Sequence, residues 1–331
     1  MRDFAYLRPR SADEAVTMLG SHQPGARYFA GGTTLYDLMK LGVEAPATVV
    51  DVTGIDELRV VDTSDRLELR IGALALMSDV AENAVLQRDF PALAESLSKA
   101  ASQQLRNMAT VGGNLLQRTR CAYFRGPPEF ACNKREPGSG CSALEGINRG
   151  HAVLGGSEAC VAVYPGDWAV ALTAFDALVD TAGPRGARSV PLRELHREPG
   201  ATPHVETALD AGELIVRIRV PRTPAARAST YHKIRDRESY AFALASAAVG
   251  LHVETGRVID ARIALGGVAT RPWRATPAER SLIGQPFTRA AARQAAQLAF
   301  ADAKPLRHNA YKVALGIETV TDALMIAKDR S

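Results

Sequence analysis

The sequence predicts an α+β protein made of two successive parts. Up to about residue 180, short apolar strands alternate with helical segments and glycine-rich turns, which is an α/β pattern. Residues 230–268 are strand-like around a turn at 254–256, and residues 288–328 are rich in alanine and helical in pattern. Because strands followed by helices are typical of a separate α+β unit, we expect a second domain, connected after the Gly-, Pro- and charge-rich segment 183–204.

The elements of the first part can be assigned in order. Ser11, with Glu14 three residues later, forms a capping box that begins a short helix ending at Gly20. Apolar strands are expected at 28–30 and at 48–52. The other expected elements are a helical stripe at Leu35, Leu38, Met39 and Leu41, a hairpin over 58–71 that turns at 62–65, a mostly helical segment at 78–101 and an apolar segment at 167–177.

Composition restricts the class of protein. With 331 residues, 46% of them hydrophobic, the chain can bury a substantial core in two or three domains. The net charge of only +4, without any Lys/Arg block, argues against a nucleic-acid partner. The longest apolar run, 242–253, is interrupted by His252 and is too short to span a membrane. Residues 1–6 lack the apolar region of a secretory signal, so by its own sequence the chain is expected in the cytoplasm.

All four cysteines of the chain lie within one window of 40 residues, at Cys121, Cys132, Cys141 and Cys160. The spacing C-x10-C-x8-C-x18-C is wider than that of paired zinc knuckles and differs from the compact ferredoxin run. Four thiolates brought together by long loops suit a [4Fe–4S] cluster, and we predict that all four are its ligands. Two disulfides or a zinc site remain alternatives, although a chain of this length has little need of a disulfide staple.

Basic residues are concentrated in the same stretch. Their charge would offset the net negative charge of a cluster held by four thiolates. They are Arg118, Arg120, Arg125, Lys134, Arg135 and Arg149.

Two of the four pairs of adjacent glycines in the chain stand out as candidate ligand loops, Gly31-Gly32 within 29–35 and Gly112-Gly113 within 109–115, and both follow apolar residues. A Gly-Gly step lets consecutive backbone N–H groups approach an anion without an intervening Cβ. A single Gly-Gly pair most often makes only a turn, but two such loops in one chain are more specific. Both are candidate cradles for a pyrophosphate.

These loops, together with the segment around Lys233, resemble the FAD-binding medium subunit of the xanthine oxidase family of molybdenum hydroxylases. Within the family, the sequence is most similar to the FAD- and [4Fe–4S]-containing subunits of bacterial periplasmic aldehyde oxidoreductases. The segments that carry this similarity are 105–107, 114–121, 132–135, 137–141 and 157–160. The cysteine-bearing insertion is the most specific part, because ordinary medium subunits lack it.

The resemblance implies a fold and a division into domains. Residues 1–222 would form an FAD-binding domain of the vanillyl-alcohol-oxidase (PCMH) type, built of two α/β lobes, with a [4Fe–4S]-binding insertion at 118–162. Residues 223–331 would form a smaller domain of the CO dehydrogenase flavoprotein type, made of antiparallel strands and helices. Together they make the expected α+β protein.

The resemblance also implies the residues that bind FAD. One wall around the diphosphate would be formed by Tyr28, Phe29, Ala30, Gly31, Gly32, Thr33, Thr34, Leu35 and Tyr36. The second wall would be formed by Thr110, Gly112, Gly113 and Asn114.

Three further positions match cofactor contacts of the family. Asp167 would face the cofactor, Ile215 would line the flavin, and Lys233 would lie near the isoalloxazine, where a cation stabilises the reduced anionic form. From the residues alone, Asp167 could instead be a helix N-cap before Trp168, Ile215 a core residue and Lys233 a solvated strand lysine. Ala100 stands near the place where eukaryotic relatives hold an aromatic against the flavin, so stacking is not expected there, and their NAD-binding features are not evident.

The expected function is electron relay. The chain has no recognisable molybdenum ligands and no nucleophile paired with a base, and the scattered histidines His151, His196, His204 and His308 are interpreted as surface residues. The resemblance implies a heterotrimer for aldehyde oxidation, in which a molybdopterin-containing large subunit oxidises the substrate and a [2Fe–2S] small subunit passes electrons to FAD, which reduces an external acceptor. It also implies a periplasmic location, by co-export with a signal-bearing partner, in place of the cytoplasm.

Two other functions compete with this expectation. One is a self-contained flavin oxidoreductase, and the other is a zinc- or disulfide-stapled interaction module without enzymatic activity.

Overall fold

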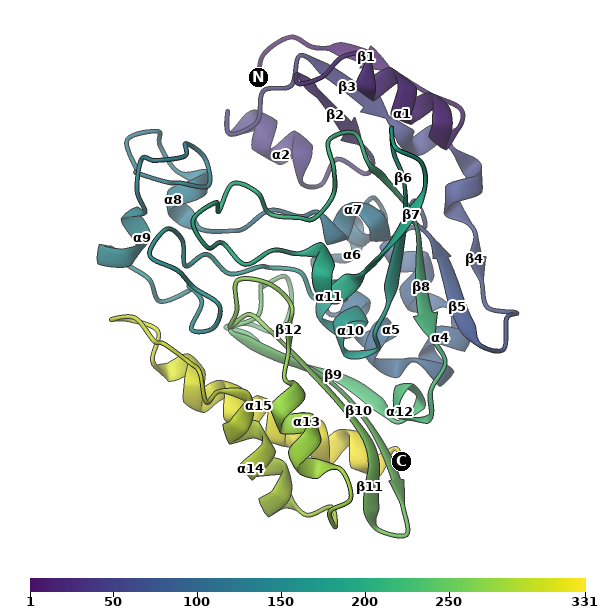
Figure 1. Ribbon diagram of the computed structural model, residues 1–331, viewed down its shortest axis with the longest axis vertical. Helices are drawn as coiled ribbons and strands as arrows, with labels where there is room; N and C mark the ends of the chain where they lie inside the picture. Colours follow the sequence, from purple (N-terminus) through teal and green to yellow (C-terminus); the bar gives the residue numbers. More distant parts are fainter.

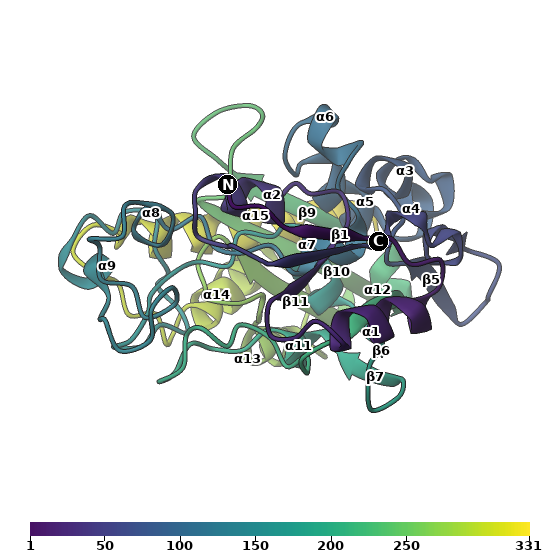
Figure 2. The same ribbon diagram turned by 90° about the horizontal axis from the view of Figure 1, so that it is seen from above.

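The computed structural model describes residues 1–331 as three sheets arranged along the long axis of the molecule (Figure 1). A three-stranded sheet lies at the N-terminal end, a five-stranded sheet in the middle, and a four-stranded sheet with the last helices at the other end. The cysteine-bearing segment projects to one side of this stack, as both views show (Figures 1 and 2).

The N-terminal lobe is a parallel sheet in the order β1-β3-β2. Ser11 caps its first helix as the sequence predicts, because the side-chain oxygen accepts a hydrogen bond from the Glu14 N–H at 3.2 Å. All four residues of β3 are buried. The elements are β1 (Ala5–Leu7), α1 (Ala12–Gly20), β2 (Ala26–Phe29), α2 (Leu35–Lys40), β3 (Thr48–Asp51), η1 (Val52–Gly54) and η2 (Asp56–Arg59).

The second lobe is an antiparallel sheet in the order β4-β5-β8-β6-β7, covered by helices around the fully buried Phe90 and Trp168. The helical segment predicted at 78–101 is broken into three helices, because Asn83 caps α4 and Pro91 begins α5. The strands are β4 (Val61–Asp62), β5 (Glu68–Gly72), β6 (Leu178–Ala182), β7 (Arg188–Pro191) and β8 (Leu214–Pro221). The helices are α3 (Met77–Glu82), α4 (Ala84–Asp89), α5 (Pro91–Ser98), α6 (Gln103–Arg106), α7 (Val111–Leu115), α10 (Trp168–Ala174) and α11 (Leu192–Leu195).

The C-terminal part is an antiparallel sheet in the order β12-β11-β10-β9, with helices packed on one face (Figure 1). The turn predicted at 254–256 joins β10 to β11, where Thr255 and Gly256 take positive φ angles. The elements are α12 (Pro224–Arg227), β9 (Ser229–Ile234), β10 (Ala245–Glu254), β11 (Arg257–Gly266), β12 (Trp273–Arg274), α13 (Thr276–Leu282), α14 (Arg289–Ala299) and α15 (Tyr311–Asp329). None of the helices has the length and apolar character needed to traverse a bilayer.

The cysteine-bearing segment 118–162 contains only two short helices, α8 (Ala122–Arg125) and α9 (Ser142–Glu145). A single side chain organises much of the rest, because the Arg135 guanidinium donates hydrogen bonds to backbone carbonyls of Tyr123, Phe124, Gly126, Pro127, Pro128 and Phe130. The segment is closed at its base, where the Thr119 hydroxyl donates to the Val163 carbonyl at 3.0 Å.

Candidate functional site

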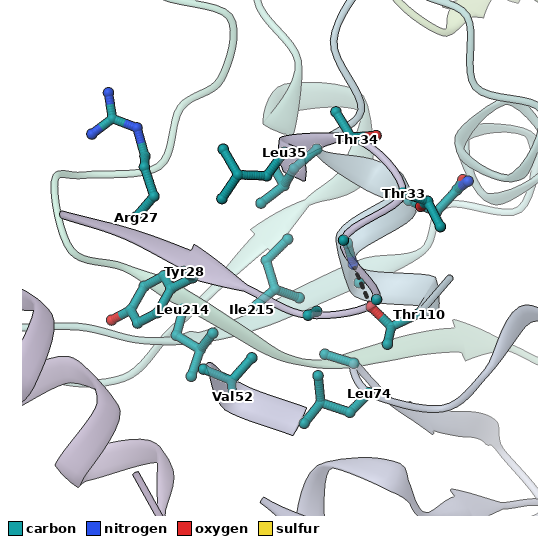
Figure 3. A pocket seen from close by; sticks show the side chains of 18 of the residues that line it. Arg27, Tyr28, Thr33, Thr34, Leu35, Val52, Leu74, Thr110, Leu214 and Ile215 are labelled. Atoms are coloured by element: carbon teal, nitrogen blue, oxygen red, sulfur yellow. Dashed lines mark hydrogen bonds between the residues drawn. The ribbon is translucent and has the colours of Figure 1, made fainter. Parts of the chain in front are cut away.

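A cavity of about 310 Å³ lies between the two N-terminal lobes (Figure 3). Loop 31–34, which connects β2 to α2, forms one wall, and residues 110–114 at the start of α7 form the second. Tyr28, Leu214 and Ile215 line another part of the cavity, on β2 and on the beginning of β8 (Figure 3). Both glycine pairs predicted from the sequence therefore face one cavity.

Three of the four glycines occupy positions that leave little room for a side chain. A Cβ at Gly31 would overlap the carbonyl oxygen of Met108, which lies just before the second loop, and Gly32 has a φ of +71°. In the second loop, a Cβ at Gly112 would lie 2.7 Å from the Cβ of Ala73. Gly31 thus lets the first loop approach the chain beside the second loop, and Gly112 lets the second loop pack against Ala73.

The two loops differ in which backbone donors are free. Thr110 caps α7 and its hydroxyl accepts the N–H of Gly113 at 3.2 Å, so this N–H already has a partner. In contrast, the N–H groups of Gly32, Thr33 and Thr34 donate to no acceptor within the protein. The Asn114 Oδ1 is also buried without a partner. Loop 32–34 therefore offers unpaired donors to a ligand in the cavity, as an anion site requires.

A second cavity, of about 620 Å³, adjoins the first. The two cavities share Gly32, Thr33, Thr34 and Asn114, so the glycine loops lie at their junction. The other residues that line the second cavity come from both lobes, the cysteine-bearing segment and the C-terminal part: Tyr36, Asp37, Met77, Ala100, Ala101, Leu105, Ala109, Gln117, Arg120, Arg125, Pro165, Asp167, Lys233, Arg237, Tyr240, Ala241 and Phe242.

A buried ion pair forms part of the wall of the second cavity. The Lys233 ammonium lies 2.8 Å from Asp167 Oδ2 and donates to the Lys99 carbonyl at 3.0 Å. Tyr231 donates its hydroxyl hydrogen to the other oxygen of Asp167 at 2.6 Å. Burial raises the pKa of Asp167, and the Lys233 charge opposes this rise.

This geometry corrects two of the simpler interpretations from the sequence. The side chain of Lys233 is only 1% exposed, so it is not a solvated strand lysine. Asp167 precedes α10, but its side chain makes no capping hydrogen bond because both oxygens are bound elsewhere.

The structure distributes the residues predicted to bind FAD over both cavities. The first cavity is lined by Tyr28, Ala30, Gly31, Gly32, Thr33, Thr34, Leu35, Thr110, Gly112, Gly113, Asn114 and Ile215. Tyr36, Asp167 and Lys233 line the second, so Ile215 does not share a cavity with Lys233. Phe29 lines neither, and its ring lies where a Cβ at Gly32 would have to be placed.

The four cysteines carry free thiols and gather in the projecting segment. Cys132 and Cys141 form a backbone bridge, and the Cys121 sulfur lies 3.2 Å from His151 Nε2. Burial raises the pKa of Cys121 to about 11, and Cys132 and Cys160 contribute to the same rise. No three Cys, His, Asp or Glu side chains lie close enough together to hold a single metal ion.

The structure corrects the prediction for two of the histidines. His151 and His196 are buried, contrary to the prediction that they are surface residues, whereas His204 and His308 are exposed as predicted. His196 Nε2 lies 2.8 Å from the Leu115 carbonyl, and burial lowers the pKa of His196 to about 4. The polar sequence around each buried histidine gave no signal of this burial.

Comparisons with known proteins place the chain in a family. Residues 2–223 match the FAD binding domain in molybdopterin dehydrogenase, and residues 229–326 match the CO dehydrogenase flavoprotein C-terminal domain. The chain is 44% identical over 329 residues to the aldehyde oxidoreductase FAD-binding subunit PaoB of Escherichia coli (strain K12), with 99% of each chain covered. It is 29% identical over 328 residues to the carbon monoxide dehydrogenase medium chain of Hydrogenophaga pseudoflava, covering 98% of this chain and 96% of that one.

Solved structures agree with the sequence comparisons. Carbon monoxide dehydrogenase from Hydrogenophaga pseudoflava, in a form lacking the Mo-pyranopterin moiety of its cofactor, superposes with a TM-score of 0.78 at 29% identity, over 99% of this chain and 98% of that one. Reconstituted CO dehydrogenase from Oligotropha carboxidovorans gives a TM-score of 0.78 at 26% identity, over 100% and 99% of the two chains. The predicted fold class is confirmed, and the chain belongs to the xanthine oxidase family of molybdenum hydroxylases, as an FAD-binding medium subunit.

Proposed function

We propose that this chain binds FAD across the two adjoining cavities and is the electron-transfer subunit of a molybdenum-dependent aldehyde oxidoreductase. The observation that carries the proposal is loop 32–34, whose three unpaired N–H groups lie at the junction of the cavities. The 44% identity to an aldehyde oxidoreductase FAD-binding subunit supports the substrate class.

The cavities suit the two ends of an FAD molecule. The first is lined by Tyr28, Leu214 and Ile215, which offer an apolar surface to an adenine ring, so the proposal moves Ile215 from the flavin, where the family resemblance implied it, to the adenine end. The second holds the buried Lys233 ammonium, fixed by Asp167, at a place where a flavin ring system would gain from a nearby cation. Bound FAD would supply the capacity to take up electrons and pass them to an external acceptor.

The same geometry argues against a self-contained flavin oxidoreductase. Such an enzyme needs a free base near the flavin to take a proton from its substrate. Two carboxylates line the second cavity, Asp37 and Asp167. Asp37 is paired with two arginines, and both oxygens of Asp167 are bound by Lys233 and Tyr231. Substrate oxidation is therefore assigned to a partner chain.

We further propose that Cys121, Cys132, Cys141 and Cys160 ligate one [4Fe–4S] cluster. Two observations support this: all four cysteines are free thiols of one segment, with Cys132 and Cys141 paired in a backbone bridge, and Lys134 lines the same cavity as Cys160. Four cysteine thiolates are the ligand set that holds a [4Fe–4S] cluster.

The partners and the location follow as part of the same proposal. A molybdopterin-containing large subunit would oxidise the aldehyde, and a [2Fe–2S] small subunit would deliver electrons to this chain. Names such as "medium chain" and "FAD-binding subunit" among the relatives support such a division of labour. The proposed location is the periplasm, reached with a signal-bearing partner; fractionation of cells that express the tagged complex tests it, and recovery with cytoplasmic markers would reject it.

The decisive test combines a spectrum with an activity assay. The purified chain should show flavin absorption with a broad shoulder at about 400 nm from iron–sulfur charge transfer. Benzaldehyde oxidation with an artificial acceptor should require co-expression of all three subunits. Turnover by the isolated chain would refute the relay and favour a self-contained flavoenzyme, and a colourless protein would favour a stapled interaction module.

A further inference from the structure

The cysteine-bearing segment contributes two guanidinium groups to the second cavity. Arg120 and Arg125 both line it, together with Gly32, Thr33 and Thr34 of the first glycine loop. Arg120 directly precedes the cysteine at 121 and so belongs to the cysteine-bearing segment, and its side chain lines the second cavity. No sequence motif marks either arginine as a ligand-binding residue.

The charges at this point do not balance within the protein. Arg120 lies 3.2 Å from Asp37 Oδ2, and Arg125 is paired with the same oxygen. One carboxylate thus faces two guanidinium groups. Asp167, the other carboxylate that lines the cavity, is already neutralised by Lys233. The wall of the second cavity therefore carries an excess positive charge that an anionic ligand would offset.

Arg120 also has an unused donor. Its Nε is buried and has no hydrogen-bond partner in the protein, and its guanidinium packs over the Phe242 ring at 4.9 Å. A buried donor without a partner costs free energy, which a ligand acceptor at that position would recover. Asn114, across the shared junction, has an unpaired buried oxygen as well.

We propose that Arg120 binds the diphosphate of FAD, so that the cysteine-bearing segment completes the FAD site. This inference rests on the proposed function, since it assigns a further residue to the same ligand. The diphosphate is the chosen target because the unpaired N–H groups of loop 32–34 lie in the same cavity as Arg120, and both kinds of donor prefer an anion. The two cofactor regions of the chain would then be joined through one side chain.

The test compares the full-length Arg120→Gln chain with the wild type. FAD affinity is measured by flavin fluorescence after removal of bound FAD, and iron content is measured in parallel. Loss of a charge-assisted hydrogen bond should weaken FAD binding by roughly 10- to 100-fold, while iron content stays at the wild-type level. Arg120→Lys keeps the charge without the planar fork and should give an intermediate affinity.

Two controls separate the contact from a general effect. Arg149→Gln makes the same change in charge on an exposed arginine of the same segment, outside both cavities, and should leave FAD affinity unchanged. Riboflavin, which has no phosphate, should bind Arg120→Gln and wild type equally well. Unchanged FAD affinity in Arg120→Gln, an equal loss for riboflavin, or a parallel loss of iron would each overturn the inference. A wild-type chain that binds no FAD would instead overturn the proposed function itself.

Discussion

Replacing Lys233 by methionine would leave the carboxylate of Asp167 buried without its cation. The two side chains are 1% and 7% exposed, so water cannot take over the role of the ammonium. Breaking a buried ion pair by removing one partner costs roughly 3–5 kcal/mol of unfolding free energy. We expect a loss of this size for Lys233→Met at pH 8, because the Tyr231 hydroxyl is then the one side-chain donor left to the carboxylate.

The loss should depend on pH in a definite direction. Burial already raises the pKa of Asp167, and removal of Lys233 takes away the first opposing charge. A carboxyl group whose pKa is raised on folding favours the folded state at low pH, and this contribution is lost as pH rises. Each pH unit over which only the folded variant holds the proton costs about 1.4 kcal/mol, so a loss of 3–5 kcal/mol builds up over roughly two to four pH units above the ordinary carboxyl range.

Chemical denaturation followed by circular dichroism, at several pH values between about 4.5 and 8, measures this prediction. Lys304→Met removes an exposed lysine and should shift stability by less than about 0.5 kcal/mol at every pH. The double variant Lys233→Met/Asp167→Asn removes both charges and should recover most of the loss. If Lys233→Met has the same pH profile as wild type, Asp167 is not left charged and buried, and the reasoning fails.

Three further predictions concern the glycine loops and the cysteine-bearing segment. Gly31→Ala should abolish FAD retention, because the new Cβ would overlap the carbonyl oxygen of Met108. Gly113→Ala should lower FAD retention only in part, because the Thr110 hydroxyl oxygen, 2.9 Å from the new Cβ, can rotate away. Equal flavin content in the two variants would contradict this prediction. Cys132→Ser should lower iron content while flavin remains, and stoichiometric iron would remove this residue from the ligand set. Arg135→Gln should make the segment sensitive to limited proteolysis while the rest of the chain stays resistant, because it removes several carbonyl hydrogen bonds at once; unchanged cleavage would show that other contacts hold the loop.

The sequence predicted those elements whose signals are local. The Ser11 cap, the hairpin between β4 and β5 and the turn between β10 and β11 all depend on residues within short windows of the sequence. The breaks at Asn83 and Pro91 carried recognisable cap signals that the helical periodicity outweighed. In contrast, β6 joins the central sheet by pairing with β8, which is distant in the sequence, and β7 is added at the edge by pairing with β6.

The same distinction holds for the candidate site. Adjacent glycines and grouped cysteines are visible in the sequence because their chemistry depends on residue type and spacing. The burial of His151 and the orientation of Arg120 into the second cavity depend on segments that approach only in the folded chain. Polar residues of this kind look like surface residues until the long-range contacts are known.

The hydrogen bond between Thr119 and Val163 has a consequence for how the molecule is built. It holds residue 119, where the chain enters the projecting segment, next to residue 163, where the chain leaves it and returns to the FAD-binding lobes. Because the ends already meet, the entropic cost of closing the intervening loop depends only weakly on its length. The segment can therefore lengthen, shorten or be replaced by a tight connection without altering the register of the central sheet, which makes this point of the chain a natural junction for exchanging modules between related flavoproteins.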